Sequence, residues 1–353
     1  MQFLDDSLLP ENQDKLVITV APYGPEWMPG DFPEDIPVTM DEHVQKAIDC
    51  YNAGATVLHI HVRELDGHGS KRLSKFNELL GLLKQAVPDM ILQVGGSISF
   101  APETDGAAAK WLSDDTRHML ADLTPKPDQV TIAVNTVQMN IMDLITDEEA
   151  AGTSLSQPEM YHAYREMTVP AGPTWVEEHL RRLTANGIQP HFQLTAMPDL
   201  ETVERLVRRG HYKGPLNLTW IGIGGGFDGP SPYNFVEFMR RTPDGATLTF
   251  ESVMRNVLPI NTIATALGMH TRCGIEDTLY GPRKGEKMSS VKQIEQIVRI
   301  SRELGREIAT GKEAKEIYKI GVQYNSTEET LRQLSMPPNR EKGQRAVPLR
   351  AVA

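Results

Sequence analysis

Short apolar runs alternate with amphipathic stretches along most of the chain. The apolar runs predict eight strands, at residues 16–21, 55–62, 90–94, 129–134, 189–194, 216–223, 247–251 and 270–275. Parallel strands joined by helices produce this alternation, and eight such units are typical of a (β/α)8 (TIM) barrel. We therefore predict the α/β class and a single barrel domain.

The stretches between these runs predict helices, two of which begin at capping boxes. Thr39 with Glu42 forms one box, and Thr310 with Glu313 forms the other. Further helices are expected at residues 75–86, 107–123, 158–167, 174–185, 200–209, 234–241 and 260–267, with a long helix after Ser289. We expect residues 1–334 to form the barrel with an extra C-terminal helix. The Pro- and Arg-rich residues 335–353 are expected to form an irregular tail.

Composition narrows the class of protein. The net charge of −11 argues against nucleic acid as a partner, because phosphate binding requires a basic face. The two cysteines cannot form a disulfide framework and fit a reducing compartment. The chain has neither an apolar run of membrane-spanning length nor the charge order of a signal peptide at its N-terminus. We expect a soluble, cytoplasmic protein with no membrane partner.

Two histidines at the end of the second predicted strand are the first candidates for chemistry. His59 and His61 are two residues apart, so they share one face of the strand, about 7 Å apart along it. Two imidazoles in this arrangement can hold a divalent metal ion and leave positions for a third ligand and for substrate. The same pattern also occurs as two polar residues at a strand end.

The eighth predicted strand supplies a third candidate ligand. Arg272 and Glu276 share one face by period two, and Asp277 follows in the loop. In an eight-stranded barrel the second and eighth strands flank the first, so Glu276 can approach His59 and His61 across the mouth. Two imidazoles and a carboxylate suit Zn²⁺ with open coordination, although Co²⁺ and Mn²⁺ remain open. Glu276 and Asp277 could also be a surface acidic pair.

The two motifs in this order, HxHxR at residues 59–63 and HxRxGxED at residues 270–277, resemble the β-keto acid cleavage enzyme family. The resemblance extends from Leu16 to about Ile320. It implies a Zn²⁺-dependent reaction, with one ion per chain, in which a β-keto acid and acetyl-CoA give acetoacetate and a new acyl-CoA. It also implies a homo-oligomer, either a dimer or a tetramer.

By matching positions, the resemblance assigns roles to six residues. His59, His61 and Glu276 would ligate the metal, and Asp277, held by Arg272, would be the base that helps to generate the nucleophile. Glu26, after the first strand, would contact the substrate and the arginine.

The substrate contacts are where the chain departs from the family pattern. The turn Gly95-Gly96-Ser97 stands where many members have Ser-Thr-Gly-Gly, so a hydroxyl contact is lost or taken over by Ser97. Asn135 and Thr136 are the nearest equivalents of the family's contacts at the fourth strand. His191 replaces the glutamate of a Pro-Glu pair. The sequence leaves the keto acid and the charge of its tail open.

Other interpretations remain at this stage. A metal-dependent hydrolase or aldolase on the same barrel would act without CoA, and a metal-stabilised binding protein would have no turnover. Arg283, Lys284 and Lys287 form a basic cluster that could meet CoA phosphates or be a solvated loop.

Overall fold

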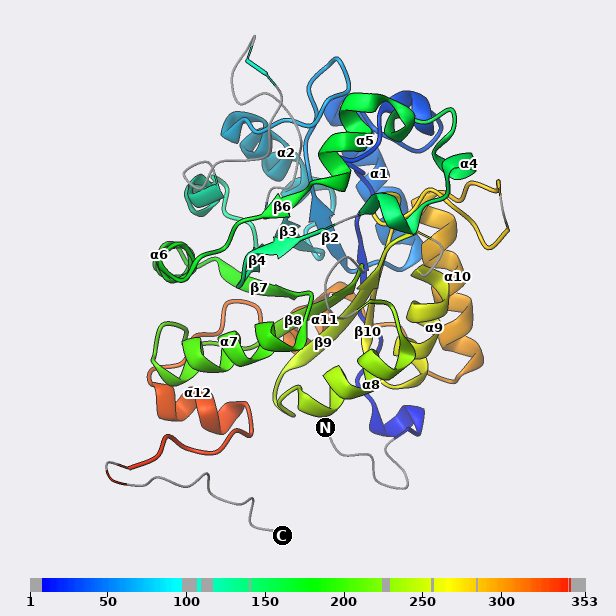
Figure 1. Ribbon diagram of the computed structural model, residues 1–353. Helices are drawn as coiled ribbons and strands as arrows, with labels where there is room; N and C mark the ends of the chain where they lie inside the picture. Colours follow the sequence, from blue (N-terminus) through cyan, green and yellow to red (C-terminus); the bar gives the residue numbers. More distant parts are fainter. Residues whose placement is uncertain are drawn as a thin grey trace.

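The computed structural model describes residues 8–96, 107–108, 117–139, 141–223, 229–254, 257–283, 285–341 and 343. Its centre is a closed barrel of eight parallel strands (Figure 1). In chain order these are β1 (Ile18–Val20), β2 (Val57–Ile60), β3 (Ile91–Val94), β4 (Gln129–Ala133), β7 (Gln189–Leu194), β8 (Asn217–Gly222), β9 (Thr247–Ser252) and β10 (His270–Cys273). The predicted barrel and all eight predicted strands are confirmed.

Closure of the barrel places β1 between β2 and β10. Val20 is paired with Leu58 of β2 on one side and with Cys273 of β10 on the other. The ends of β2 and β10 therefore open at the same rim, on either side of β1. The strands that carry the two sequence motifs therefore both lie next to β1, as predicted.

Helices surround the strands and bury their outward-facing side chains. They are α1 (Met40–Ala53), α2 (Leu73–Ala86), α6 (Pro173–Ala185), α7 (Met197–Arg208), α8 (Pro232–Arg241), α9 (Val257–Ala266), α10 (Ser290–Glu303), α11 (Gly311–Ile317) and α12 (Thr327–Gln333). Alternation along a strand sends every second residue to this layer. Trp220 of β8, for example, stacks on Phe238 of α8 with ring centroids 5.1 Å apart.

Loops and short elements cover the carboxyl ends of the strands. They include the two-stranded sheet of β5 (Val137–Gln138) and β6 (Thr168–Val169), and the helices α4 (Asp147–Ala150) and α5 (Pro158–Arg165). An apolar cluster joins these elements to the loop after β1 through Trp27, Leu155, Tyr164 and Ile221. This cluster covers the end of the barrel at which the strands have their carboxyl ends, and it is formed by loop segments that are distant in sequence.

Most predicted helices are observed with shifted ends. Helix α7 begins at Met197, three residues before the predicted start, because the Asp199 carboxylate accepts hydrogen bonds from the backbone N–H groups of Thr195 and Ala196. Of the helix predicted at 107–123, the described part includes a 3-10 turn at Met119–Asp122, and residues 109–116 lie outside the described residues. Helix α12 and the β5–β6 sheet had no counterpart in the prediction.

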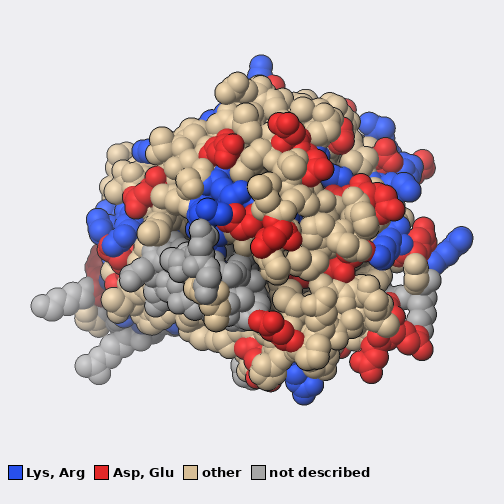
Figure 2. All heavy atoms as spheres, turned by 90° about the horizontal axis from the view of Figure 1, so that it is seen from above, with Lys and Arg blue, Asp and Glu red and all other residues tan. Residues whose placement is uncertain are grey.

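Charged side chains of both signs lie on the surface of the molecule (Figure 2). On the face shown in Figure 2, Lys and Arg side chains are interspersed with Asp and Glu. None of the described helices is both long and apolar enough to cross a bilayer.

Candidate active site

The two histidines and Glu276 meet at the mouth of the barrel, as predicted. His59 Nε2 lies 3.2 Å from His61 Nε2, and the two Glu276 oxygens lie 3.4 Å from His59 Nε2 and 3.5 Å from His61 Nε2. All three side chains are buried, and each offers a ligand atom within 4.8 Å of the others. The group has the donor types and the spacing of a site for a divalent cation.

The surrounding hydrogen bonds fit this interpretation. The Gln93 amide is oriented by donating to Gln129, so its oxygen accepts from His59 Nδ1 at 2.8 Å and leaves the lone pair of His59 on Nε2. Burial lowers the pKa of His59 to about 4, which keeps the imidazole neutral. Glu276 Oε2 is buried and has no hydrogen-bond partner among the described residues, and a cation would satisfy it. The residues present therefore fit a metal ion.

Gly95 allows the histidines to pack at this rim. A Cβ at position 95 would lie 2.4 Å from His61 Nε2 and 3.0 Å from His59 Nε2. The next residue, Gly96, donates its N–H to Thr131 Oγ1 at 2.6 Å. The sequence predicts that a hydroxyl contact at this turn is lost or taken over by Ser97. The absence of a side chain at Gly95 has a steric reason. Ser97 lies outside the described residues.

Arg272 gathers three carboxylates beside the candidate metal ligands. Its Nη2 donates to Glu276 at 2.7 Å and to Asp277 at 2.9 Å, and its Nε donates to Asp277 at 3.2 Å. Its Nε also lies 3.3 Å from Glu251 Oε2, an ion pair that the sequence analysis did not predict. Burial raises the pKa of Asp277 to about 6 although Arg272 opposes the shift. Asp277 is thus oriented and, near neutral pH, able to accept a proton.

Glu26 reaches the same region from the loop after β1. Arg63, the arginine of the first motif, holds this loop by donating from Nη2 to the carbonyls of Tyr23 (2.6 Å) and Gly24, and from Nη1 to Gly67 (2.7 Å). Glu26 is buried, and burial followed by repulsion from Glu276 raises its pKa well above the usual range. In the described part of the chain no hydrogen bond or ion pair joins Glu26 to Arg272, so the expected direct contact is replaced by a shared cavity.

Two adjoining cavities meet at Arg272, Glu276 and Glu251. We call the first the Glu26 cavity; it holds about 470 Å³ of space, part of it open to solvent, and its wall includes Glu26, Tyr164 and Asp277. The second, the histidine cavity, holds about 660 Å³ on the same measure and is lined by both histidines, both glycines and Thr131, among others. A substrate at the histidines therefore has space on either side of Arg272.

The predicted contacts at the fourth strand have other partners in the structure. Asn135 Nδ2 donates to Asp199 Oδ1 at 2.6 Å, and Thr136 Oγ1 accepts from the Ala171 N–H at 3.0 Å. Neither residue lines the two cavities, and their substrate role stays a prediction. Thr131, on the inner face of β4, lines the histidine cavity instead. His191 lies in the barrel interior, 2.6 Å from Thr219 Oγ1.

A closed parallel barrel with a buried His-His-Glu group and an Arg–Asp pair at its carboxyl end defines a class of barrel enzymes with a candidate metal site. The family model described as "beta-keto acid cleavage enzyme" matches residues 15–320. The chain therefore belongs to the β-keto acid cleavage enzyme family, as the sequence motifs predicted.

Curated relatives agree with this assignment. The 3-keto-5-aminohexanoate cleavage enzyme of Acetoanaerobium sticklandii is 27% identical over 86% of this chain and 98% of its own length. The 3-dehydrocarnitine:acetyl-CoA trimethylamine transferase of Rhizobium meliloti is 22% identical over 81% and 90%, and the 3-oxoadipate:acetyl-CoA acetyltransferase of Cupriavidus necator is 23% identical over 79% and 86%. A solved ternary complex of ObcA with a C4-CoA adduct and oxalate has a TM-score of 0.58 at 15% identity, covering 80% of this chain and 67% of that one. It shares the fold.

Proposed function

We propose that this enzyme exchanges acyl groups between a β-keto acid and acetyl-CoA, with Zn²⁺ as its metal. In this reaction the acyl group of the keto acid passes to CoA, and the acetyl group joins the released acetate unit to form acetoacetate. The observation that carries the proposal is the meeting of the His-His-Glu group with the Arg272–Asp277 pair in a member of this family. Names of relatives that include acetyl-CoA support the co-substrate.

His59, His61 and Glu276 would hold the metal, since these are the buried groups whose ligand atoms converge. A bound divalent ion would act as a Lewis acid toward the keto group and carboxylate of the substrate. Two imidazoles and one carboxylate are a frequent zinc ligand set, which supports Zn²⁺ over harder cations.

Asp277 would accept the proton that is released as the nucleophile forms. Arg272 holds both Asp277 oxygens and so fixes the direction in which the carboxylate faces. Glu26 and Thr131 line the space around the ligands and would contact the bound substrate.

The test is a set of β-keto acids with neutral, cationic and anionic tails, each incubated with acetyl-CoA with and without a chelator. We expect acetoacetate and a new acyl-CoA in equal amounts, abolished by the chelator and restored by Zn²⁺. Turnover of a keto acid without CoA would instead favour a hydrolase or aldolase. No turnover of any keto acid by the metal-loaded protein would exclude the proposed reaction.

A further inference from the structure

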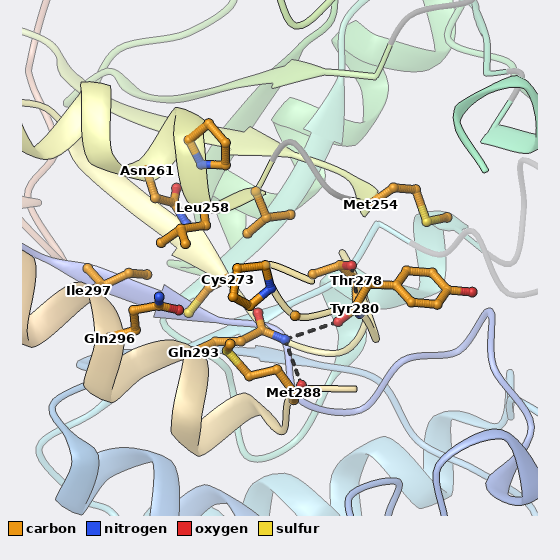
Figure 3. A pocket seen from close by; sticks show the side chains of 14 residues that line it. Met254, Leu258, Asn261, Cys273, Thr278, Tyr280, Met288, Gln293, Gln296 and Ile297 are labelled. Atoms are coloured by element: carbon orange, nitrogen blue, oxygen red, sulfur yellow. Dashed lines mark hydrogen bonds between the residues drawn. The ribbon is translucent and has the colours of Figure 1, made fainter. Parts of the chain in front are cut away.

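A third cavity lies outside the barrel, next to Cys273 of β10 (Figure 3). We call it the rear cavity; it is enclosed by α9, α10 and the loops that follow β9 and β10. It holds about 570 Å³ of space, part of it open to solvent. None of the described residues that line it is an Asp, Glu, Lys, Arg or His, so the described part of its wall carries no formal charge.

The rear cavity shares a wall with the active site. Met254 lines both the rear cavity and the Glu26 cavity, and its N–H donates to the Asp277 carbonyl at 2.8 Å. Thr278, directly after the candidate base, also lines the rear cavity. The loops that form it follow the seventh and eighth barrel strands, where barrel enzymes often bind the phosphate-bearing part of a ligand.

The wall combines apolar side chains with amides. Met254, Leu258 and Ile297 supply apolar surface. Gln293 is fully engaged within the protein. Its oxygen accepts from the Gly274 N–H at 2.9 Å. Its amide nitrogen donates to the carbonyls of Thr278 at 3.0 Å and Met288 at 3.1 Å (Figure 3).

Two other amides in this wall have hydrogen-bonding capacity left. The half-buried Gln296 side chain makes no hydrogen bond with the part of the chain that the structure describes. Asn261 donates to the Arg272 carbonyl at 2.8 Å, while its buried oxygen accepts no hydrogen bond from the described residues. A ligand with uncharged amide groups on an aliphatic chain would match such a wall, whereas an ionised group would lose its hydration without a partner.

We propose that the rear cavity binds the pantetheine arm of acetyl-CoA. This arm is uncharged and carries two secondary amides between methylene groups and a geminal dimethyl group, which is the chemistry that the wall complements. The thioester would then pass over Met254 into the Glu26 cavity, and the phosphates would lie toward Arg283, an exposed residue next to Pro282 of the lining. This inference rests on the proposed function for the identity of its ligand.

The test compares acetyl-CoA with acetyl-N-acetylcysteamine, which keeps the thioester but lacks most of the arm. Leu258→Trp fills the cavity from its half-buried rim, and Gln296→Leu removes the free amide. We expect Leu258→Trp to raise the KM for acetyl-CoA at least tenfold and Gln296→Leu to raise it about threefold. The KM for the keto acid and the kcat/KM for the truncated thioester should stay within twofold of wild type.

The control is Leu82→Trp, the same change at an exposed leucine of α2, which should alter neither constant. An unchanged KM for acetyl-CoA in both cavity variants would overturn the inference. An equal loss of kcat/KM with the truncated thioester would also overturn the inference. It would show that the substitution distorts the wall around Met254 rather than removing a contact with the pantetheine arm.

Calorimetric binding of free CoA separates this inference from the proposed reaction. If wild type binds CoA and Leu258→Trp does not, the rear cavity is the CoA site even where no keto acid is turned over. If both bind CoA equally, the rear cavity is not the site, whatever the turnover. If Leu258→Trp does not fold, Gln296→Leu and Arg283→Gln decide the matter by the same measurements.

Discussion

Steric limits at single residues shape the candidate metal site. The two imidazoles and Glu276 converge because the residue across from them on the rim has no side chain. The sequence shows at Gly95 only a departure from the family pattern, and the steric reason for the glycine is visible only in the folded molecule.

Gly95→Ala should therefore weaken metal binding. Its Cβ would have to displace His61, whose Nε2 lies 2.4 Å from the ideal Cβ position. We expect at least a tenfold loss of Zn²⁺ affinity in competition with a chromophoric chelator. Gly81→Ala in α2, where a Cβ meets nothing within 4 Å, is the matched control and should retain full affinity. Equal affinities in the two variants would contradict the steric argument.

Asp277→Asn tests the candidate base. An amide cannot accept the proton, so we expect kcat to fall by about 10²–10⁴-fold, the usual contribution of a general base. Metal content by atomic emission and the far-UV spectrum should stay at wild-type values, since Asp277 is not among the three converging ligands. A variant with less than a threefold loss of kcat would remove Asp277 from this role.

The elements show how far sequence reasoning extends and where it stops. Barrel order places β2 and β10 on either side of β1, which brings the two motifs together. Strand period does not account for Glu276, because β10 ends at Cys273 and Glu276 lies in a turn in which the Asp277 N–H donates to the Gly274 carbonyl. Glu251 was not foreseen, because a glutamate in a run with strand-like alternation does not reveal its partner on the next strand. The β5–β6 sheet was missed for a similar reason, since each of its strands has two residues and depends on the other.

Arg63 joins elements whose relation the sequence does not show. Its guanidinium connects the loops after β1 and β2 through three backbone carbonyls while being almost fully buried. Arg63→Met would leave these carbonyls without donors, so we expect the free energy of unfolding to fall by about 2–4 kcal/mol. Urea denaturation measures the loss.

The matched control for this prediction is Arg209→Met, at an exposed position after α7, where the change should stay within about 0.5 kcal/mol. Because the loop held by Arg63 carries Glu26, Arg63→Met should also raise the KM for the keto acid. A normal stability with an altered KM would show that Arg63 contacts substrate rather than holding the loop.

In the molecule as a whole, the candidate active site and a set of stabilising contacts lie at opposite ends of the barrel. The candidate site lies at the carboxyl ends of the strands, while α11 leads to Tyr318 at the opposite end. There the Tyr318 hydroxyl lies 2.8 Å from Thr249 Oγ1, and its carbonyl accepts from Gln189 and Asn217. The capping box of α11 was predicted, but the contacts of Tyr318 with the barrel interior depend on residues 69 to 129 positions away.

His270 lies at this stabilising end and gives the molecule a pH dependence that is independent of the metal site. Its Nδ1 accepts from the Val17 N–H at 3.2 Å, and burial, aided by Arg306, lowers its pKa from 6.5 to about 3. The unfolded chain therefore binds a proton below pH 6.5 that the folded chain does not bind until about pH 3. Stability from this group is complete above pH 6.5 and is lost as the pH falls.

Between pH 7 and pH 5 the loss from His270 alone is about 2 kcal/mol. His270→Asn keeps an acceptor for Val17 but does not titrate, so its stability should fall by about 2 kcal/mol less than that of wild type over this interval. Urea denaturation at both pH values measures the difference, and His68→Asn, at an exposed turn, should behave as wild type. Parallel pH profiles for wild type and His270→Asn would mean that the buried imidazole is protonated in the folded chain and that its contact with Val17 is not the one described.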